Sequence, residues 1–518
     1  MSNTNVNPFS LLTNTTISTH KNAYKKILDE ITLIFNSLKS SYGPMGLDKL
    51  CVDNSGDIFI SNDGATIIKS MVVDSPISKI LTSLAIEQDN AVGDGTTSVV
   101  LLAYYLIKEG INLINQDIEP TTVINGYRMA YSEVSKQIKT MCYRVSHSQK
   151  LDLIDTAISS KIIYEEKDHF IKIISGVLKS NSKNIHIVKS VGGSMKDTKW
   201  SKGFILDCTI ASELMRKEYT KNRDYTNDNS DKNNNKDEGC LLFCGNFGLL
   251  KEKLPLTVNI NSNVDDLDRI REEEINLTKK KCQKIIETGA KLVLLSGGID
   301  EICIKMFVDA NVAAVRRVDV ADLKLLSNKV HDSPDYLEDA CTEIDGFELK
   351  QYGEYKLMHV LCDRSTILIR GPTRQICDEI QRSINDAVEV VRSTEMSNDD
   401  FILPGGGAVE AQLYKKLRMF GNSLDMREHI SIFKYAEALK ELVCNLCENA
   451  GYSGESVFGE LLSEQEMCGV DLSKENYVIQ DNVKGGIIEP AKYKLKAIKA
   501  ATEAAMAILR INEIIEFN

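Results

Sequence analysis

The stretch Gly93-Asp94-Gly95-Thr96-Thr97-Ser98 runs directly into the apolar, helix-like segment Val99-Val100-Leu101-Leu102-Ala103-Tyr104-Tyr105-Leu106. Glycines can adopt positive φ and, lacking Cβ, let backbone N–H groups approach a ligand. The hydroxyl residues fall at the predicted helix N-terminus, where unpaired N–H groups and the helix dipole favour phosphate oxygens. Asp94 would repel a phosphate unless a divalent cation lay between them. The stretch therefore predicts a loop for a metal-bound phosphate, although a capped helix after a glycine-rich turn would show the same residues.

This loop is not of the Walker A type, because no GxxxxGK[ST] segment occurs, and kinase-like VAIK and HRD segments are missing as well. Without a lysine, the loop needs metal charge, and phosphate with hard oxygen ligands indicates Mg²⁺. Hydrolysis would also need a carboxylate that positions or deprotonates water. Two candidates are Asp63 in NDGAT (residues 62–66) and Asp386 in INDA (residues 384–387). Taken alone, the first is also a turn signal and the second is also typical of a solvated helix surface.

The composition is that of a globular chain with several domains, since 43% of its 518 residues are hydrophobic. Its 62 basic and 74 acidic residues leave a net charge of −12, which disfavours a broad nucleic-acid surface. The polar residues 1–21 contain no signal-peptide core, and no apolar run approaches the roughly 18 to 20 residues of a membrane span. The 13 cysteines are scattered, and Cys444-Asn-Leu-Cys447 lacks partners for a zinc site, so reduced thiols are expected. A cytoplasmic protein is predicted.

Hydrophobic periodicity changes along the chain. Apolar residues at helical spacing predict helices from residue 27 to 38 and from 77 to 106, with a strand-turn-strand signal from 50 to 60 between them. The run LVLLSGG at residues 292–298, a helical stretch and the run VAAV at 312–315 then indicate a βαβ unit. Helical spacing resumes at residue 374 and continues to 509. The sequence therefore predicts a helical domain interrupted by an α/β module.

Two polar segments lie within the predicted α/β module. Residues 216–238 contain an asparagine- and aspartate-rich run that cannot bury enough apolar surface to order itself, so they are interpreted as a flexible surface loop. Residues 264–288 are acidic early and basic late, which suits the dipole of an exposed helix.

The combination and order of these segments resemble the group II chaperonins, the family that includes the archaeal thermosome and the eukaryotic TCP-1 ring complex. The resemblance covers nearly the whole chain. It is carried by five segments in the family's order: YGPMGLDK (42–49), NDGAT (62–66), GDGTTS (93–98), LPGGG (403–407) and GGIIEP (485–490).

The resemblance implies a multidomain fold of the mixed α+β and α/β class. It comprises a helical equatorial ATP-binding domain, a small intermediate α/β hinge domain and an inserted apical α/β domain that binds substrate and carries a helical lid protrusion. The corresponding ranges are 1–141 with 406–518, 142–206 with 359–405, and 207–358, with the lid at about 249–286. The segments at 222–237 and 476–482 depart from the family pattern, and the first looks like an insertion.

The same resemblance assigns the site. Asp94 is expected to contact Mg²⁺, and Asp63 and Asp386 to address the attacking water, with Asp386 arriving from the intermediate domain. Lys161 resembles a lysine that senses the γ-phosphate, and Glu489 would meet the ribose. The full set expected at the nucleotide is Gly43, Pro44, Gly95, Thr96, Thr97, Ser98, Lys161, Gly406 and Glu489.

The implied function is that of an ATP-dependent chaperone subunit of a cytosolic double-ring folding chamber, with ATP and Mg²⁺ as cofactors. Hydrolysis would drive lid closure. Paralogous chaperonin subunits and unfolded client proteins are the expected partners, with neither nucleic acid nor membrane. Two alternatives stay open: a structural ring subunit that binds nucleotide with little turnover, and a stand-alone metal-dependent phosphotransferase.

Overall fold

The computed structural model describes residues 15–52, 56, 58–71, 75–146, 149–179, 185–220, 240–251, 264–334, 341–353, 355–395, 401–464, 467–474 and 476–517. The chain forms two compact units. One combines Met1–Ser175 with Asp378–Asn518, and the other is Gly176–Cys377. The first unit is thus assembled from both ends of the chain, and the second is inserted between them. Both unit boundaries fall inside the predicted intermediate segments, 142–206 and 359–405, so the three-domain division stays a prediction.

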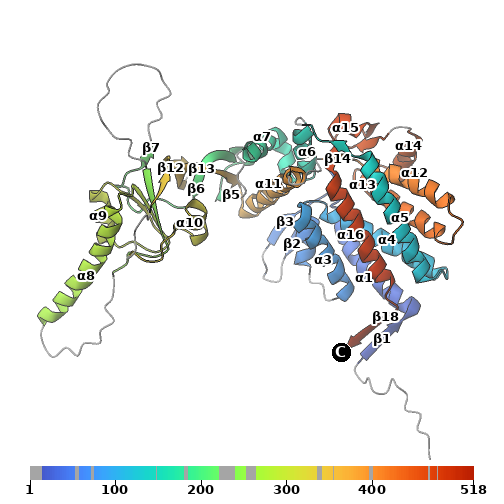
Figure 1. Ribbon diagram of the computed structural model, residues 1–518, viewed down its shortest axis with the longest axis horizontal. Coiled ribbons are helices and arrows are strands. Elements are labelled where there is room, and N and C mark those ends of the chain that lie inside the picture. The colour runs from blue at the N-terminus through green and yellow to red at the C-terminus, as the bar shows by residue number, and fades with distance from the viewer. Residues whose placement is uncertain are drawn as a thin grey trace, which may run out of the picture. The chain divides into compact units, whose positions relative to one another are not determined.

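The first unit is mainly helical (Figure 1), and its core is built around helix α4 (Thr96–Asn115). Among the described helices, this helix contacts at least six others, and it packs most extensively against four of them. They are α1 (His20–Lys39), α3 (Pro76–Val92), α13 (His429–Asn449) and α16 (Ala491–Leu509). The further helices of this unit are α2 (Gly64–Ser70), α5 (Pro120–Met141), α6 (Gln149–Ile158), α12 (Ala408–Asn422), α14 (Gly454–Ser463) and α15 (Asn482–Gly485), with the 3₁₀ turn Ile162–Glu166.

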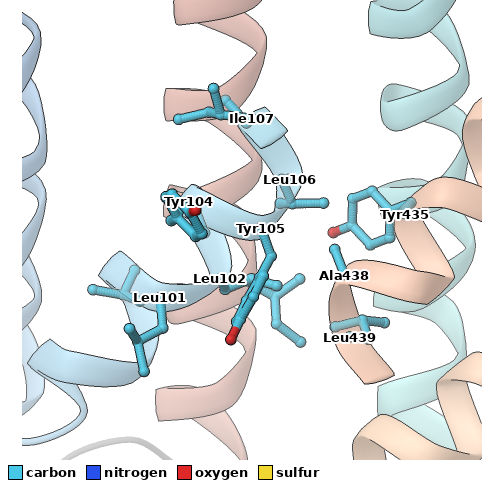
Figure 2. Packing of buried hydrophobic residues seen from close by; sticks show 14 of the residues in the cluster. Leu101, Leu102, Tyr104, Tyr105, Leu106, Ile107, Tyr435, Ala438 and Leu439 are labelled. Carbon is cyan, nitrogen blue, oxygen red and sulfur yellow. The ribbon is translucent and has the colours of Figure 1, made fainter. Parts of the chain in front are cut away.

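Helix α4 is buried on nearly all sides because its first residues after the glycine-rich loop are apolar all round. Leu102, Tyr105 and Leu106 face the α13 residues Tyr435, Ala438 and Leu439 (Figure 2). On another side, the ring of Tyr104 stacks on Phe35 of α1 at a centroid distance of 4.0 Å. The expectation that no apolar stretch approaches a membrane span is wrong for α4 by length and composition. However, 72% of its most apolar window is buried inside the protein, so this surface packs the core.

Short strands complete the first unit. The predicted strand-turn-strand is confirmed as the antiparallel pair β2 (Lys49–Val52) and β3 (Ile58–Ser61), whose connecting residues 53–55 and 57 lie outside the described residues. β1 (Thr15–Thr19) pairs with β18 (Glu513–Phe517), which joins the two chain ends (Figure 1). The remaining strands are β4 (Tyr143–Arg144), β14 (Phe401–Pro404) and β17 (Ile488–Pro490) in one sheet, and β15 (Gly469–Asp471) and β16 (Val478–Gln480) in another.

The second unit contains two sheets. In one, parallel β8 (Cys240–Gly245), β9 (Leu292–Leu295) and β10 (Ala313–Val315) are joined by antiparallel β11 (Cys341–Ile344), and α9 (Glu301–Asp309) links β9 to β10. The predicted βαβ unit is confirmed. The predicted helix at 264–288 is α8 (Val264–Glu287), and α10 (Val320–Leu326) follows β10. The other sheet contains β5 (His186–Val191), β6 (Lys199–Leu206), β7 (Glu218–Thr220), β12 (Gly346–Tyr352) and β13 (Tyr355–Gly371), and a 3₁₀ turn spans Met195–Asp197.

The remaining predictions concern the polar segments, the division into domains and the cysteines. The predicted flexible loop at residues 216–238 is wrong near its start, because Glu218–Thr220 forms β7 and pairs with β12. Residues 221–239 lie outside the described residues, as do 252–263 of the proposed lid segment. Helices α7 (Lys167–Lys179) and α11 (Arg374–Glu395) contain the two unit boundaries. All 13 cysteines are free thiols, and Cys444 and Cys447 are buried in α13 as packing residues.

Candidate functional site

The glycine-rich loop joins α3 to α4 with two residues in the left-handed conformation. Gly93 ends α3 at φ 76°, and Gly95 begins α4 at φ 75°. A Cβ on Gly95 would lie 1.9 Å from the ring of Tyr493, so both φ and space require glycine there. Within the described structure no side chain caps α4. The capped-helix interpretation is therefore wrong, and the first N–H groups of α4 stay available to an anion.

This loop forms part of a cavity of about 660 Å³ inside the first unit. The cavity is lined by segments from both halves of the unit, including β17 and the glycines that follow β14. β14 and β17 pair with Leu403 opposite Glu489. The predicted site residues that line it are Gly43, Pro44, Asp63, Asp94, Gly95, Thr96, Thr97, Ser98, Lys161, Gly406 and Glu489. Asp386 does not line the cavity, but it contacts Lys161, which lines the cavity.

Lys161 and Asp386 form a buried ion pair that brings segments 225 residues apart into contact. The Lys161 Nζ lies 2.8 Å from Asp386 Oδ2, with side-chain exposures of 7% and 18%. Burial raises the pKa of Asp386 to about 7, although the charge of Lys161 opposes that shift. For Lys161, burial lowers the pKa, but Asp386, Asp63 and Asp94 outweigh burial and raise it above its ordinary value. Lys161 therefore stays cationic, while Asp386 can exchange a proton near neutral pH.

Asp63 is the N-cap of α2, and its carboxylate is well bonded. It accepts hydrogen bonds from the Thr66 N–H at 2.9 Å, the Thr66 hydroxyl at 2.7 Å and the Thr96 hydroxyl at 2.9 Å. Burial raises the pKa of Asp63, but Lys161 and these hydrogen bonds lower it by more, so the pKa lies below its usual value. The interpretation as a turn signal is confirmed, because Asp63 caps α2, and the same aspartate also lines the cavity.

Replacing Asp63 by alanine is expected to lower the free energy of unfolding by about 1–2 kcal/mol, because α2 loses its cap. Asparagine can also cap a helix, so Asp63→Asn should lose less stability than alanine, although it lacks the charge and one of the two acceptor oxygens. Because folding depresses the pKa of Asp63, its ionised form stabilises the fold above the unfolded-state pKa, and that stability is lost as pH falls. Denaturant titration of the three proteins measures this, and equal loss in both variants would contradict the capping role.

A second ion cluster in the first unit was not predicted from the sequence. Lys494 Nζ lies 2.7 Å from Glu410 Oε1 and 2.7 Å from Glu489 Oε2. Burial lowers the pKa of Lys494, but the two carboxylates outweigh burial and hold it well above its ordinary value. Glu489, expected only at the ribose, is thus also the ion partner of a buried lysine. Its pKa is raised by burial.

Two further residues, not predicted from the sequence to belong to the site, form hydrogen bonds that hold its loops. The Tyr493 hydroxyl lies 2.8 Å from Ser98 Oγ, and that serine also donates to the Gly95 carbonyl at 2.9 Å, so the Ser98 side chain helps to hold the loop. The Asn62 amide donates to the Ser160 carbonyl at 2.8 Å, next to Lys161. Only Asn62, adjacent to Asp63 in a quoted motif, had a sequence signal that could have found it.

The donor set fits a magnesium ion held mainly by a ligand. Asp94 is buried, burial raises its pKa, and its Oδ1 accepts the Gly95 N–H at 2.6 Å. The described residues contain no group of three or more His, Cys, Asp or Glu side chains that could hold a metal ion. Mg²⁺ in nucleotide sites is commonly bound through one or two carboxylates plus phosphate oxygens and water. One buried carboxylate beside an open helix N-terminus suits that arrangement.

Comparisons with known proteins agree on the family. Residues 34–518 match the model of the TCP-1/cpn60 chaperonin family. T-complex protein 1 subunit alpha of Encephalitozoon cuniculi is 37% identical over 95% of this chain and 94% of its own length, and that of Dictyostelium discoideum is 32% identical over 94% and 93%. Thermosome subunit alpha of Thermoplasma acidophilum is 31% identical over 96% and 92%. The sequence resemblance to alpha subunits of the eukaryotic complex, carried by segments such as GGID (297–300) and AVRRV (314–318), is confirmed.

Proposed function

The chain belongs to the TCP-1/cpn60 chaperonin family and is a chaperone subunit, and on this premise we propose that it binds Mg-ATP and hydrolyses it within a double-ring folding chamber. One observation carries the proposal. The uncapped N-terminus of α4, Asp94, Asp63 and Lys161 line one cavity of about 660 Å³, and Asp386 contacts that wall through Lys161. Groups suited to phosphate binding, metal binding and proton transfer therefore surround a single cavity, where they could act on one bound nucleotide.

Each group has a distinct task in the proposed reaction. The first N–H groups of α4 and the hydroxyls of Thr96 and Thr97 bind phosphate oxygens, and Asp94 holds Mg²⁺, which neutralises phosphate charge when bound. Lys161 adds a fixed positive charge at the γ-phosphate. Asp386, whose pKa lies near 7, accepts a proton from the attacking water. Asp63 orients that water with its charge while it caps α2.

The remaining predicted roles are part of the same proposal. Gly43, Pro44 and Gly406 contact the nucleotide, with Ser98 and Gly95 shaping its phosphate loop, and Glu489 meets the ribose. Support comes from their common position on the cavity wall. The three-domain division, with the lid near 249–286 and client binding in the inserted region, is proposed from family membership. ATP turnover would drive closure of that lid.

We place the subunit in the cytoplasm, in a ring with paralogous chaperonin subunits that acts on unfolded proteins. The relatives named above are subunits of the T-complex protein 1 and of the thermosome, which supports an assembly. A structural ring subunit with little turnover is the second candidate. It is disfavoured because Asp63, Asp94 and Asp386 are all present and the last contacts the site through Lys161.

Purification of the native particle through a tag on this chain tests the proposal. Light scattering should give a mass many times the 57.8 kDa of one chain, mass spectrometry should identify paralogous subunits, and hydrolysis should require Mg²⁺. A particle that binds ATP without turnover at this subunit would favour the structural candidate. Magnesium-dependent activity in a particle of one-chain mass would instead identify a stand-alone phosphotransferase.

A further inference from the structure

Helix α11 carries an ion pair between the partly exposed Arg382 and the buried Glu379, and the charge of Lys161 also acts on Glu379. Arg382 Nε donates to Glu379 Oε2 at 2.8 Å, and Glu379 is only 2% exposed. The same guanidinium reaches beyond its own helix, since Arg382 Nη2 donates to the backbone carbonyl of Ile60 at 3.1 Å. A guanidinium suits this double task because its fork of N–H donors can serve a carboxylate and a carbonyl together.

The place of the Ile60 contact relates it to the site. Arg382 precedes Asp386 by four residues on one helix, so the two side chains project from the same face. Arg382 therefore contacts β3 one turn before Asp386 contacts Lys161. Two anchors one turn apart fix both the position and the rotation of this face of α11.

The partners of these two anchors are themselves joined. Ile60 lies in β3, three residues before Asp63. Asn62, which directly precedes Asp63, donates an amide hydrogen bond to the Ser160 carbonyl next to Lys161. The segment from Ile60 to Asp63 thus contacts Arg382 on one side and the Lys161 loop on the other. Displacement of Arg382 would move Asp386 relative to Lys161 and Asp63 together.

We propose that Arg382 is a positioning residue for ATP hydrolysis, which holds α11 against the Ile60 carbonyl so that the Asp386 carboxylate reaches the site. This inference rests on the proposed function. Arg382 does not line the cavity, so nucleotide binding does not depend on it. The competing explanation is that Arg382 merely neutralises the buried Glu379. Under that explanation the Ile60 contact has no effect on turnover.

Two variants separate these explanations in the assembled particle. Glu379→Gln removes the ion pair but leaves Arg382 to bind Ile60, so turnover should remain within about twofold of wild type. The double variant Arg382→Met with Glu379→Gln removes the contact without leaving a buried unpaired carboxylate. Its turnover number should fall about 10- to 100-fold, because small misplacements of a catalytic group have effects of that size. Its Mg-ATP affinity should stay within about twofold.

Hydrogen exchange without nucleotide provides a readout that does not depend on hydrolysis. Exchange of the α11 amides around Asp386 should speed up in the double variant and stay unchanged in Glu379→Gln. Wild-type turnover together with unchanged exchange in the double variant would overturn the positioning role. If the wild-type particle itself does not hydrolyse ATP, the proposed function fails, while the exchange comparison still decides whether Arg382 holds α11 in place.

Discussion

Replacing Asp386 by asparagine is expected to slow ATP hydrolysis at this subunit by about 10²- to 10⁴-fold, the usual contribution of a general base. The amide keeps the size of the side chain but cannot accept a proton from water. Binding of Mg-ATP should persist, because the cavity wall that includes Asp94 and the N-terminus of α4 is unchanged. Single-turnover assays of ATP bound to tagged particles measure the chemical step separately from binding.

The pH dependence supplies a second test of the same residue. Because burial raises the pKa of Asp386 to about 7, its carboxyl group is protonated below that pH and cannot act as a base. Hydrolysis in the wild type should therefore decline as pH falls through about 7, and the asparagine variant should lose this dependence. Glu389→Gln is the matched control, since it removes an exposed carboxylate from the same helix. Equal turnover in the Asp386 variant and this control would disprove the base role.

Replacing Lys494 by methionine is expected to lower the free energy of unfolding by about 3–5 kcal/mol, because it leaves the buried Glu410 without its cation. Glu489 loses the same partner, but it is partly exposed at the cavity, where water can solvate its charge. Denaturant titration, followed by hydrogen exchange in α16, should show the first unit opening at lower denaturant concentration.

Two controls separate charge from packing. Lys496→Met makes the same change at an exposed position of α16 and should shift the midpoint little. A triple variant that adds Glu410→Gln and Glu489→Gln removes the uncompensated charges and should recover much of the lost stability. If Lys494→Met and Lys496→Met unfold at the same concentration, the ion cluster does not stabilise the unit.

Much of the local structure could be predicted because it depends on neighbours in the chain. The apolar run after Ser98 forms α4, and the pattern around Gly297 forms the βαβ unit. Turn residues and hydrophobic periodicity act over a few positions, so a single sequence carries them. The same locality explains the error about α4. Its composition is that of a membrane span, and only its burial among other helices shows what covers it.

The candidate site divides in the same way. Asp63 and Asp94 belong to motifs whose order along the chain identified the family, and Lys161 was assigned from the resemblance to that family. The partners Lys494 and Arg382 had no such signal, because a lysine or arginine in an amphipathic helix is usually solvated. Their importance comes from contacts with residues far away in sequence, Lys494 with Glu410 and Arg382 with the Ile60 backbone.

The family, the glycine-rich segment at residues 93–98 and the acidic residues could be recognised in the sequence, because short motifs carry them. Only the tertiary structure decided how these groups are used. It left the N-terminus of α4 uncapped, paired Lys161 with Asp386 across 225 positions and buried Glu489 against Lys494. The physical reason is that ion pairing and burial determine the protonation states of these side chains and the contacts they make. Both depend on distances in space, which the order of residues does not contain.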